Sequence, residues 1–158
     1  MLDSLDRKLL TLLQKDNRAS LGDLARIVGS SRSAVARRLR RLRAEGVIRS
    51  DVAVVDRQRL GSLETFVIQM EVRRESGRMA SDFTAQMLEL PEVQQCYLTT
   101  GTTNCVLIVL VWGSAQLEEF VEEHLVDNPF VREFTTSLVT RDIKVGLGVP
   151  ILPADDDG

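Results

Sequence analysis

The stretch that decides the fold is LGDLARIVGSSRSAVARRLRRL, residues Leu21 to Leu42. In its first half, Ala25 leaves room for a crossing helix, and Gly29 permits the left-handed backbone that side chains disfavour. In its second half, apolar residues recur at helical spacing and form an inner stripe. They are Val35, Leu39 and Leu42. This pattern predicts two helices joined by a tight turn, which is typical of a DNA-binding helix-turn-helix.

The outer face of the second helix is rich in arginine. Such a helix can enter the major groove, where arginine pairs with guanine through two hydrogen bonds. We expect the first five of the following residues to face bases or flanking phosphates, and the last two to hold phosphates. They are Ser31, Arg32, Ser33, Ala36, Arg37, Arg40 and Arg41. Arg38 lies nearer the apolar stripe, and two alternatives remain for its side chain: a structural salt bridge or a DNA contact. The alternative is a solvated basic helix in an ordinary bundle.

Charge is distributed unevenly along the 158 residues. Residues 1–60 carry 14 Lys and Arg against 7 Asp and Glu, whereas residues 61–158 carry 6 against 16. This length allows one ordinary domain or two small ones. A basic first half and an acidic second half predict nucleic acid as the partner of the first half and a different role for the second.

Several classes of protein are disfavoured by the sequence. The chain opens with acids where a signal peptide carries bases, and its longest apolar run, residues 105–112, is far shorter than the ~20 residues of a membrane helix. We therefore expect a cytoplasmic protein without membrane contact. Cys96 and Cys105 have neither metal-ligand spacing nor a histidine partner, so we expect buried thiols rather than a disulfide or a metal site.

Helix signals cover the N-terminal third. An amphipathic helix is predicted over about residues 3–15, and Ser20 begins a second helix that ends at Gly29. Ser30 or Ser31 caps the third helix, which Gly46 stops. The β-branched run at residues 47–55 predicts a short strand or wing. We expect residues 1–55 to form the helix-turn-helix DNA-binding domain and residues 56–62 to form a hinge.

The periodicity changes after residue 62. Strands are predicted over residues 65–72, 93–100, 104–112 and 131–140, with helices over 78–90 and around 117–125. Each helix ends in a similar joint, LPEV at Leu90–Val93 and NPFV at Asn128–Val131. The order βαββαβ predicts a ferredoxin-like domain over residues 63–144, so the fold class is α+β. Residues 145–158 are expected to form a mobile tail.

These segments together resemble the leucine-responsive/asparagine-responsive (Lrp/AsnC) class of bacterial and archaeal regulators. The resemblance rests on the N-terminal helices and on LPEV, TTG at 99–101 and TSLV at 136–139, and it runs from Leu2 to about Lys144. It implies a second domain that dimerises through its sheet and binds a small effector, often an amino acid, between subunits. It further implies homodimers that assemble into tetramers or octamers on double-stranded operator DNA.

The resemblance also implies an effector site. Its residues are Gly101, Thr102, Thr103, Asn104 and Thr136. The family commonly has Gly-x-x-Asp in this loop, and Asn104 offers an ammonium group a dipole in place of a charge, which weakens the hydrogen bond about twofold. Phe134 is a second departure, so the pocket is altered, weakened or unused. The alternative is a tight turn in which Asn104 bonds its own backbone.

The sequence therefore predicts a DNA-binding transcription regulator modulated by a small metabolite. Two alternatives stay open: an effector-independent architectural DNA-binding protein, and a metabolite-binding regulatory subunit of an enzyme. We expect no cofactor and no enzymatic activity, because we find no paired carboxylates in a plausible cleft, no phosphate loop and no nucleophile beside a base. His124, the single histidine, is expected to be a packed or interface residue.

Overall fold

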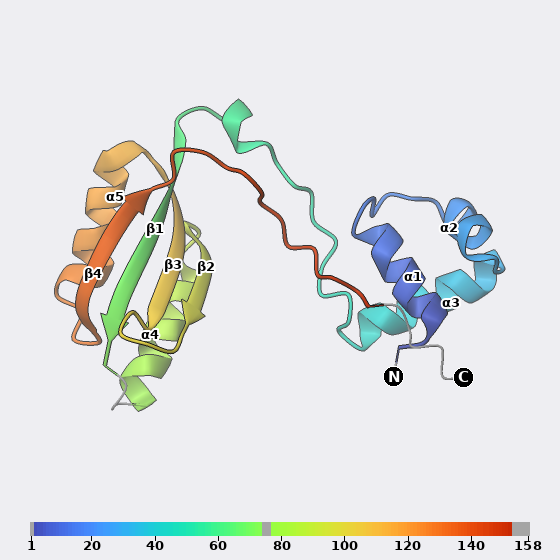
Figure 1. Cartoon of the computed structure of the whole chain (residues 1–158), viewed down its shortest axis with the longest axis horizontal. Coiled ribbons are helices and arrows are strands. Elements are labelled where there is room, and N and C mark those ends of the chain that lie inside the picture. The colour runs from blue at the N-terminus through green and yellow to red at the C-terminus, as the bar shows by residue number, and fades with distance from the viewer. Residues whose placement is uncertain (1, 74–76, 153–158) are drawn as a thin grey trace. The chain divides into compact units, whose positions relative to one another are not determined.

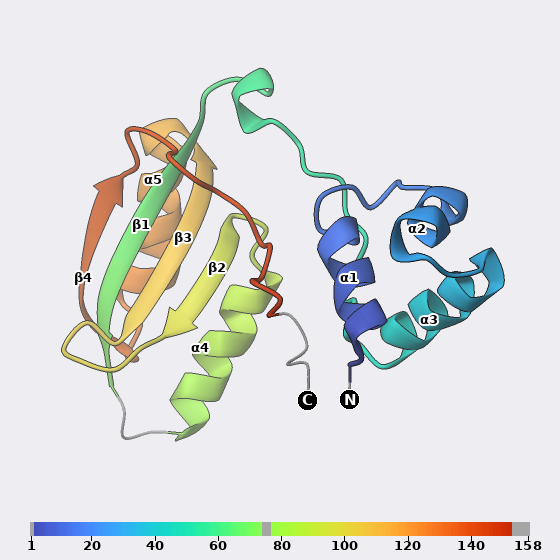
Figure 2. The ribbon, with the colours of Figure 1, turned by 45° about the vertical axis from the view of Figure 1, so that its right-hand side comes forward.

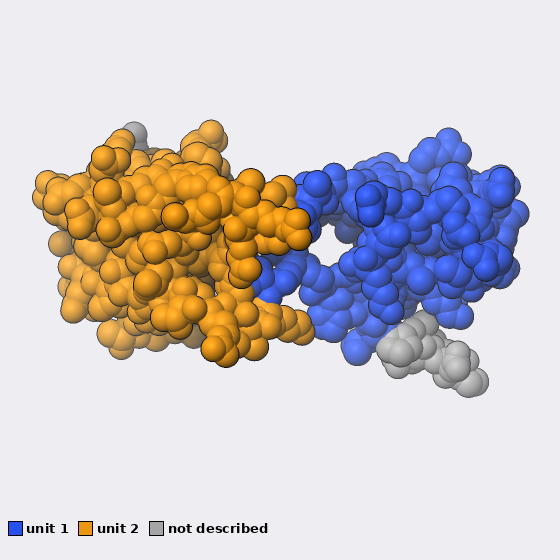
Figure 3. Space-filling model, turned by 90° about the horizontal axis from the view of Figure 1, so that it is seen from above, with its two compact units in different colours: residues 1–54, 145–158 blue, residues 55–144 orange. Residues whose placement is uncertain are grey.

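The computed structural model describes residues 2–73 and 77–152. The chain divides into two compact units (Figure 3). Unit 1 comprises Met1–Val54 together with Val145–Gly158, and unit 2 comprises Val55–Lys144. The chain thus leaves unit 1 once and returns to it after unit 2. Each unit has its own hydrophobic core.

Unit 1 contains three helices, α1 (Ser4–Leu13), α2 (Leu21–Val28) and α3 (Arg32–Ala44) (Figure 1). Their apolar faces meet in one small core. It consists of Leu9, Leu24, Ala25, Val35, Leu39 and Leu42. The inner stripe predicted for α3 is therefore buried, and Ala25 is only 5% exposed. The helix-turn-helix predicted over this stretch is confirmed.

Short polar side chains and glycine define where these helices begin and end. The side chains of Asp3, Ser20 and Ser31 accept hydrogen bonds from backbone N–H groups three residues later, as N-caps do. Gly29 ends α2 with φ of 68°, in the left-handed region that glycine enters at little cost. The tight turn between α2 and α3 follows from this residue.

The region after α3 differs from the prediction. Between Glu45 and Ser62, all of which the structure describes, no strand forms, so the strand expected over residues 47–55 is wrong. A strand needs a hydrogen-bonded neighbour, and none lies beside this run. Val52 and Val54 are 60% and 95% exposed as a result. Within the expected hinge the chain forms only a 3₁₀ turn, η1 (Arg57–Arg59).

Unit 2 is a four-stranded antiparallel sheet with two helices. Its elements are β1 (Leu63–Val72), α4 (Gly77–Glu89), β2 (Val93–Leu98), β3 (Cys105–Trp112), α5 (Gly113–Val121), its π-helical continuation η2 (Glu122–Val126) and β4 (Val131–Leu138). The strands are ordered β2-β3-β1-β4 (Figure 2). This arrangement confirms the predicted ferredoxin-like α+β fold.

The two faces of this sheet have different surroundings. Alternate residues of β1 and β3, such as Ile68 and Leu107, are fully buried against Phe83 of α4 and Phe120 of α5. The residues between them point to the other face and are only half-buried or exposed. On this face, which we call the open sheet face, lie Val67, Tyr97, Val106, Ile108, Leu110 and Trp112. Along β3 the open sheet face is apolar, β4 adds polar residues to it, and α4 and α5 pack on the opposite face.

The segment after β4 does not extend as a separate tail over the residues that the structure describes. Gln14 of α1 bonds the backbone of Val149 at both ends of its amide: Val149 N–H donates to Oε1 over 2.6 Å, and Nε2 donates to the Val149 carbonyl over 3.1 Å. Arg7 Nη1 donates to the Leu152 carbonyl over 3.1 Å. Val149 and Leu152 of this segment therefore bind α1, and residues 153–158 of the expected tail lie outside the described residues.

Candidate nucleic-acid interface and effector pocket

The exposed face of α3 carries the predicted DNA-contacting side chains. Ser33, Arg37 and Arg40 are all exposed and follow one another at helical spacing, while Ala36 beside them is half-buried. Arg40 Nε donates to the Ala36 carbonyl over 3.4 Å. Among the described residues, no carboxylate pairs with Arg37. This face therefore presents a hydroxyl group and two guanidinium groups to solvent.

The start of α3 is held against the start of α2. Ser31 Oγ accepts from the Ala34 N–H over 3.2 Å and lies 3.1 Å from Ser33 Oγ. The Arg32 side chain lies over Gly22, where a Cβ atom would come within 2.8 Å of its Nη2 atom. The Arg32 side chain thus contacts the start of α2, and the N-terminus of α3, with its helix dipole, can attract phosphate.

Two arginines of α3 are instead bound to α1. Arg38 Nη1 donates to Asp6 Oδ1 over 2.9 Å and also to Asp3, and Arg41 donates to the other Asp6 oxygen. Asp6 is fully buried, whereas the Arg38 side chain is 29% exposed. Arg38 therefore takes the salt bridge that the sequence left open. Arg41, predicted to hold phosphate, is engaged in the same ion-pair cluster.

This cluster also affects titration. The Asp6 N–H donates to Asp3, and together with the hydrogen bond from Arg38 it lowers the pKa of Asp3 below the ordinary value of 3.8. Asp6 accepts hydrogen bonds from two guanidinium groups and accepts a further one from the Asp3 N–H over 3.3 Å. A buried carboxylate satisfied in this way holds α3 in place across α1.

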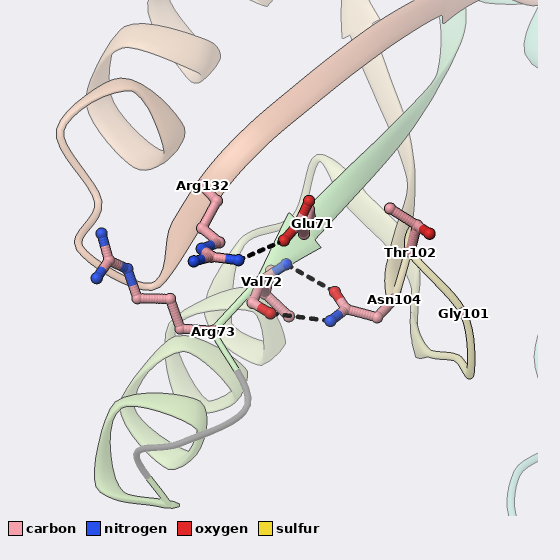
Figure 4. A pocket seen from close by; sticks show the side chains of 7 residues that line it. All are labelled: Glu71, Val72, Arg73, Gly101, Thr102, Asn104 and Arg132. Carbon is pink, nitrogen blue, oxygen red and sulfur yellow. Dashed lines mark hydrogen bonds and ion pairs between the residues drawn. The ribbon is translucent and has the colours of Figure 1, made fainter.

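A second candidate site lies in unit 2, at the sheet edge where β1 ends and β4 begins. A cavity of ≈ 560 Å³ opens there beside the loop between β2 and β3 (Figure 4). Its lining is mainly polar. The lining residues are Glu71, Val72, Arg73, Gly101, Thr102, Asn104 and Arg132. We call this cavity the effector pocket, after the effector site that the sequence predicts at its loop.

The side chain of Asn104 has a structural role in the pocket wall, because its amide bonds the backbone of β1. Its Oδ1 accepts from the Val72 N–H over 2.6 Å, and its Nδ2 donates to the Val72 carbonyl over 2.8 Å (Figure 4). The side chain is only 6% exposed. Asn104 thus bonds the end of β1 as a neighbouring strand would, and the alternative in which it bonds its own backbone is wrong.

Three charged residues of the pocket were not predicted from the sequence. Arg132 Nη1 donates to Glu71 Oε1 over 2.6 Å. Arg73 is exposed, and no carboxylate among the described residues pairs with it. The topology could have indicated them, because β1 and β4 are antiparallel neighbours, which brings the end of one beside the start of the other.

The remaining predicted effector residues are divided. Gly101 and Thr102 line the pocket, whereas Thr103 lies outside its lining and accepts the Thr99 hydroxyl on its carbonyl over 2.8 Å. Thr136 is exposed on β4, opposite Ile68, and does not line the cavity. The single chain therefore brings three of the five residues together.

His124 and the two cysteines occupy other environments. His124 packs edge-on against Phe120, and its Nδ1 lies 3.0 Å from Gln86 Nε2. Cys105 is buried, Cys96 is half-buried, and both are free thiols. Within residues 2–73 and 77–152, no cluster of three or more potential metal ligands exists and no helix is long and apolar enough to cross a membrane.

Comparison with known proteins covers both units. The family model of the Lrp/AsnC ligand binding domain matches residues 65–148. A model of winged helix-turn-helix DNA-binding domains matches residues 2–49. The first match contains the effector pocket and the second contains α1 to α3.

Individual relatives are similar along nearly the whole chain. The HTH-type transcriptional regulator y4tD of Sinorhizobium fredii is 34% identical over 95% of this chain and 89% of its own length. The DNA-binding transcriptional activator DecR of Escherichia coli is 30% identical over 96% of this chain and 99% of its own. A transcriptional regulator of Neisseria meningitidis, solved in complex with L-Met, has a TM-score of 0.85 at 27% identity over 95% of this chain and 97% of that chain.

Proposed function

The chain belongs to the Lrp/AsnC family of DNA-binding transcription regulators, and we propose that it reads operator DNA with the exposed face of α3. The observation that carries this proposal is the division of the α3 arginines. Arg38 and Arg41 are bound to Asp6, whereas Arg37 is exposed in the middle of the helix without a carboxylate partner among the described residues. A guanidinium group in that position is available to pair with guanine.

The other residues of this face position the helix. Ser33 lies at the helix N-terminus, where backbone N–H groups and the helix dipole attract phosphate. We assign Arg40 to a phosphate because it lies about one turn farther along the helix than Arg37. Unit 1 is in this proposal the DNA-binding domain, so the protein acts where operator DNA is, in the cytoplasm.

We propose that two chains associate through the open sheet face of unit 2. One recognition helix contacts only a few base pairs, and a dimer supplies two helices for half-sites about 34–36 Å apart or a multiple of that distance. The open sheet face supports this role, because an exposed apolar surface rimmed by polar residues marks an association site. Tyr97 and Trp112, 51% and 54% exposed, have side chains that such interfaces favour.

We propose that the effector pocket binds the small metabolite that modulates DNA binding. The relative from Neisseria meningitidis was solved in complex with L-Met, which supports a small-molecule site in this fold. A ligand can change DNA binding only if it prefers one assembly or domain arrangement over another. Regulation of this kind requires no catalytic step.

The DNA proposal is tested by replacing Arg37 with Ala after the preferred operator has been selected from random duplexes. We expect Arg37→Ala to relax the preference at one base position and to weaken operator binding by about 1–3 kcal/mol. Fluorescence anisotropy on the selected and on scrambled duplexes measures both. Arg59→Ala, which removes an 87% exposed arginine from unit 2, is the matched control and should bind like the native chain.

Other outcomes of this experiment favour a different function. If Arg37→Ala retains full affinity and the same base preference, α3 does not read the operator through this residue. Selection that yields no preferred sequence would favour an architectural DNA-binding protein. Absence of DNA affinity, with co-purification of an enzyme, would favour a regulatory subunit.

A further inference from the structure

The charges that line the effector pocket are unequal. The residues that line it include two arginines, Arg73 and Arg132, and one residue with a carboxylate, Glu71. Arg132 and Glu71 neutralise each other over 2.6 Å. Arg73 is left with no ion pair among the residues that the structure describes, and its side chain lies on the same side of the β1 end as Arg132 (Figure 4). The described residues that line the pocket therefore carry an excess of positive charge.

Among the described residues that line the same pocket, no carboxylate is unpaired and available to an ammonium group. Asn104 is neutral and nearly buried, and both ends of its amide are bonded to the Val72 backbone. It therefore has no negative charge to offer an amino group, and one of its two amide protons is used by the Val72 carbonyl. The carboxylate of Glu71 is held by Arg132. Among these residues, a neutral amino acid finds an unpaired guanidinium group for its carboxylate but only an already paired carboxylate for its ammonium group.

We infer that the effector pocket takes a small dicarboxylic acid, for which an amino group is unnecessary. The planar guanidinium group of Arg73 matches a carboxylate with two parallel hydrogen bonds. The second carboxylate of the ligand is attracted by the excess positive charge of the lining. Thr102 adds a hydroxyl donor at the pocket wall. This inference rests on the proposed function, in which the pocket is the effector site.

The test is thermal unfolding of the full chain with succinate, L-aspartate, L-methionine, L-lysine and inorganic phosphate, one at a time and at equal ionic strength. At a ligand concentration about 100 times Kd, we expect succinate and L-aspartate to raise Tm by several degrees and the other three compounds to leave it unchanged. A rise with L-methionine equal to or above that with succinate would overturn the inference. A rise in Tm with inorganic phosphate that equals the rise with succinate would also overturn it.

A pair of variants assigns the effect to the pocket. Arg73→Gln keeps most of the side-chain volume and removes the charge, so we expect at least a tenfold loss of succinate affinity by titration calorimetry. Arg141→Gln removes an exposed arginine of the same unit that does not line the pocket, and it should bind succinate as the native chain does. If Arg73→Gln binds succinate with unchanged affinity, the assignment of the ligand to this pocket is wrong.

Operator binding with and without succinate separates the inference from the proposed function. Succinate binding that depends on Arg73 and leaves DNA affinity unchanged supports the inference and contradicts the proposed modulation. Modulation of DNA binding by L-methionine, with no effect of Arg73→Gln, supports the proposed function and overturns the inference.

Discussion

Asp6 is a single residue on which the geometry of the DNA-binding unit depends. It is fully buried, and two arginines of α3 donate to its two oxygens across the α1–α3 crossing. Removing one partner of a buried ion pair costs more than the pair itself contributes, because a charge is left uncompensated. The helix that we propose reads DNA is therefore held by the same arginine-rich sequence from which we expect its DNA contacts.

We predict that Asp6→Asn destabilises unit 1 by about 3 kcal/mol, the low end of the range for breaking a buried pair, because both arginines keep access to water. The midpoint of urea unfolding measures this change. Asp51→Asn breaks the exposed pair with Arg43, where both side chains are 42% exposed, and should cost less than about 1 kcal/mol. Equal effects of the two variants would contradict a special role for Asp6.

The lowered pKa of Asp3 predicts an acid-dependent loss of stability. A carboxyl group whose pKa is lower in the folded chain stabilises it fully above the unfolded value, here 3.8, and this contribution is lost as the pH falls through the lower folded value. The midpoint of urea unfolding, measured at pH values from 6 to 2, should therefore stay constant down to about pH 4 and decrease at lower pH. In Asp3→Asn that fall should be smaller, and an unchanged pH profile would argue against the contribution.

Asn104 gives a prediction of the opposite pH dependence. In Asn104→Asp, the side chain still accepts from the Val72 N–H but no longer donates to the Val72 carbonyl. We expect a loss of about 1–3 kcal/mol at pH 7 and a smaller loss near pH 4, where the protonated acid regains a donor. Gln94→Glu makes the same chemical change on an exposed side chain and should stay within about 0.5 kcal/mol. Chemical denaturation at both pH values compares them.

Residues that act locally could be predicted from the sequence, and residues that act across the fold could not. Ser20, Gly29 and Ser31 form caps and turns with groups only a few positions away, so short motifs indicate them. The partner of Arg38 lies 32 positions earlier, and it becomes visible only when α1 crosses α3. Arg73 and Arg132 of the pocket likewise come together through the pairing of β1 with β4.

Among the elements, the strands of unit 2 were predicted correctly from the sequence, because each one pairs with a neighbouring strand in the sheet. Alternation of buried and half-buried side chains along β3 is the pattern expected of a strand covered on one face. The run at residues 47–55 has similar composition but no neighbouring strand in the single chain, so it stays extended and unpaired. Propensity alone does not form a strand without a hydrogen-bonded partner.

The open sheet face gives a prediction at this scale. Ile108→Glu places a charge in the middle of the proposed dimer interface, and leaving it unpaired there costs about 2–5 kcal/mol, or roughly a 30-fold or greater rise in the dimer Kd. Sedimentation velocity across a concentration series measures that constant. Leu88→Glu is the control, since Leu88 of α4 is 78% exposed, and it should leave assembly unchanged. A dimer unaffected by Ile108→Glu would contradict an interface on this face.

At the scale of the whole molecule, residues 145–152 link the end of unit 2 back to α1. The amide of Gln14 bonds both backbone groups of Val149, and Arg7 adds a third hydrogen bond. The charge pattern agrees with the division into units, because the basic residues are concentrated in the first 60 positions. The sequence predicted two domains but not the binding of the last segment to α1. A segment that contains Pro and Gly has no periodic pattern that would indicate which element it contacts.

We predict that Gln14→Ala releases this segment. Hydrogen–deuterium exchange of the Val149 amide should become faster by about one order of magnitude, the equivalent of a hydrogen bond worth roughly 1–1.5 kcal/mol. Thr11→Ala removes a hydroxyl that bonds within α1, to the Arg7 carbonyl, and should leave the exchange of residues 145–152 unchanged. Equal protection in Gln14→Ala and the native chain would show that the segment is not held by this residue.

Because residues 55–144 lie between two portions of unit 1, the sensor is an insert with two junctions, at 54/55 and at 144/145. A chimera that exchanges sensors between regulators of this kind therefore has to match both junctions and keep the returning segment paired with its own α1. A chimera joined only at the 54/55 boundary would place the returning segment of another protein on α1. Unit 2 is therefore inserted into unit 1 and does not simply follow it along the chain.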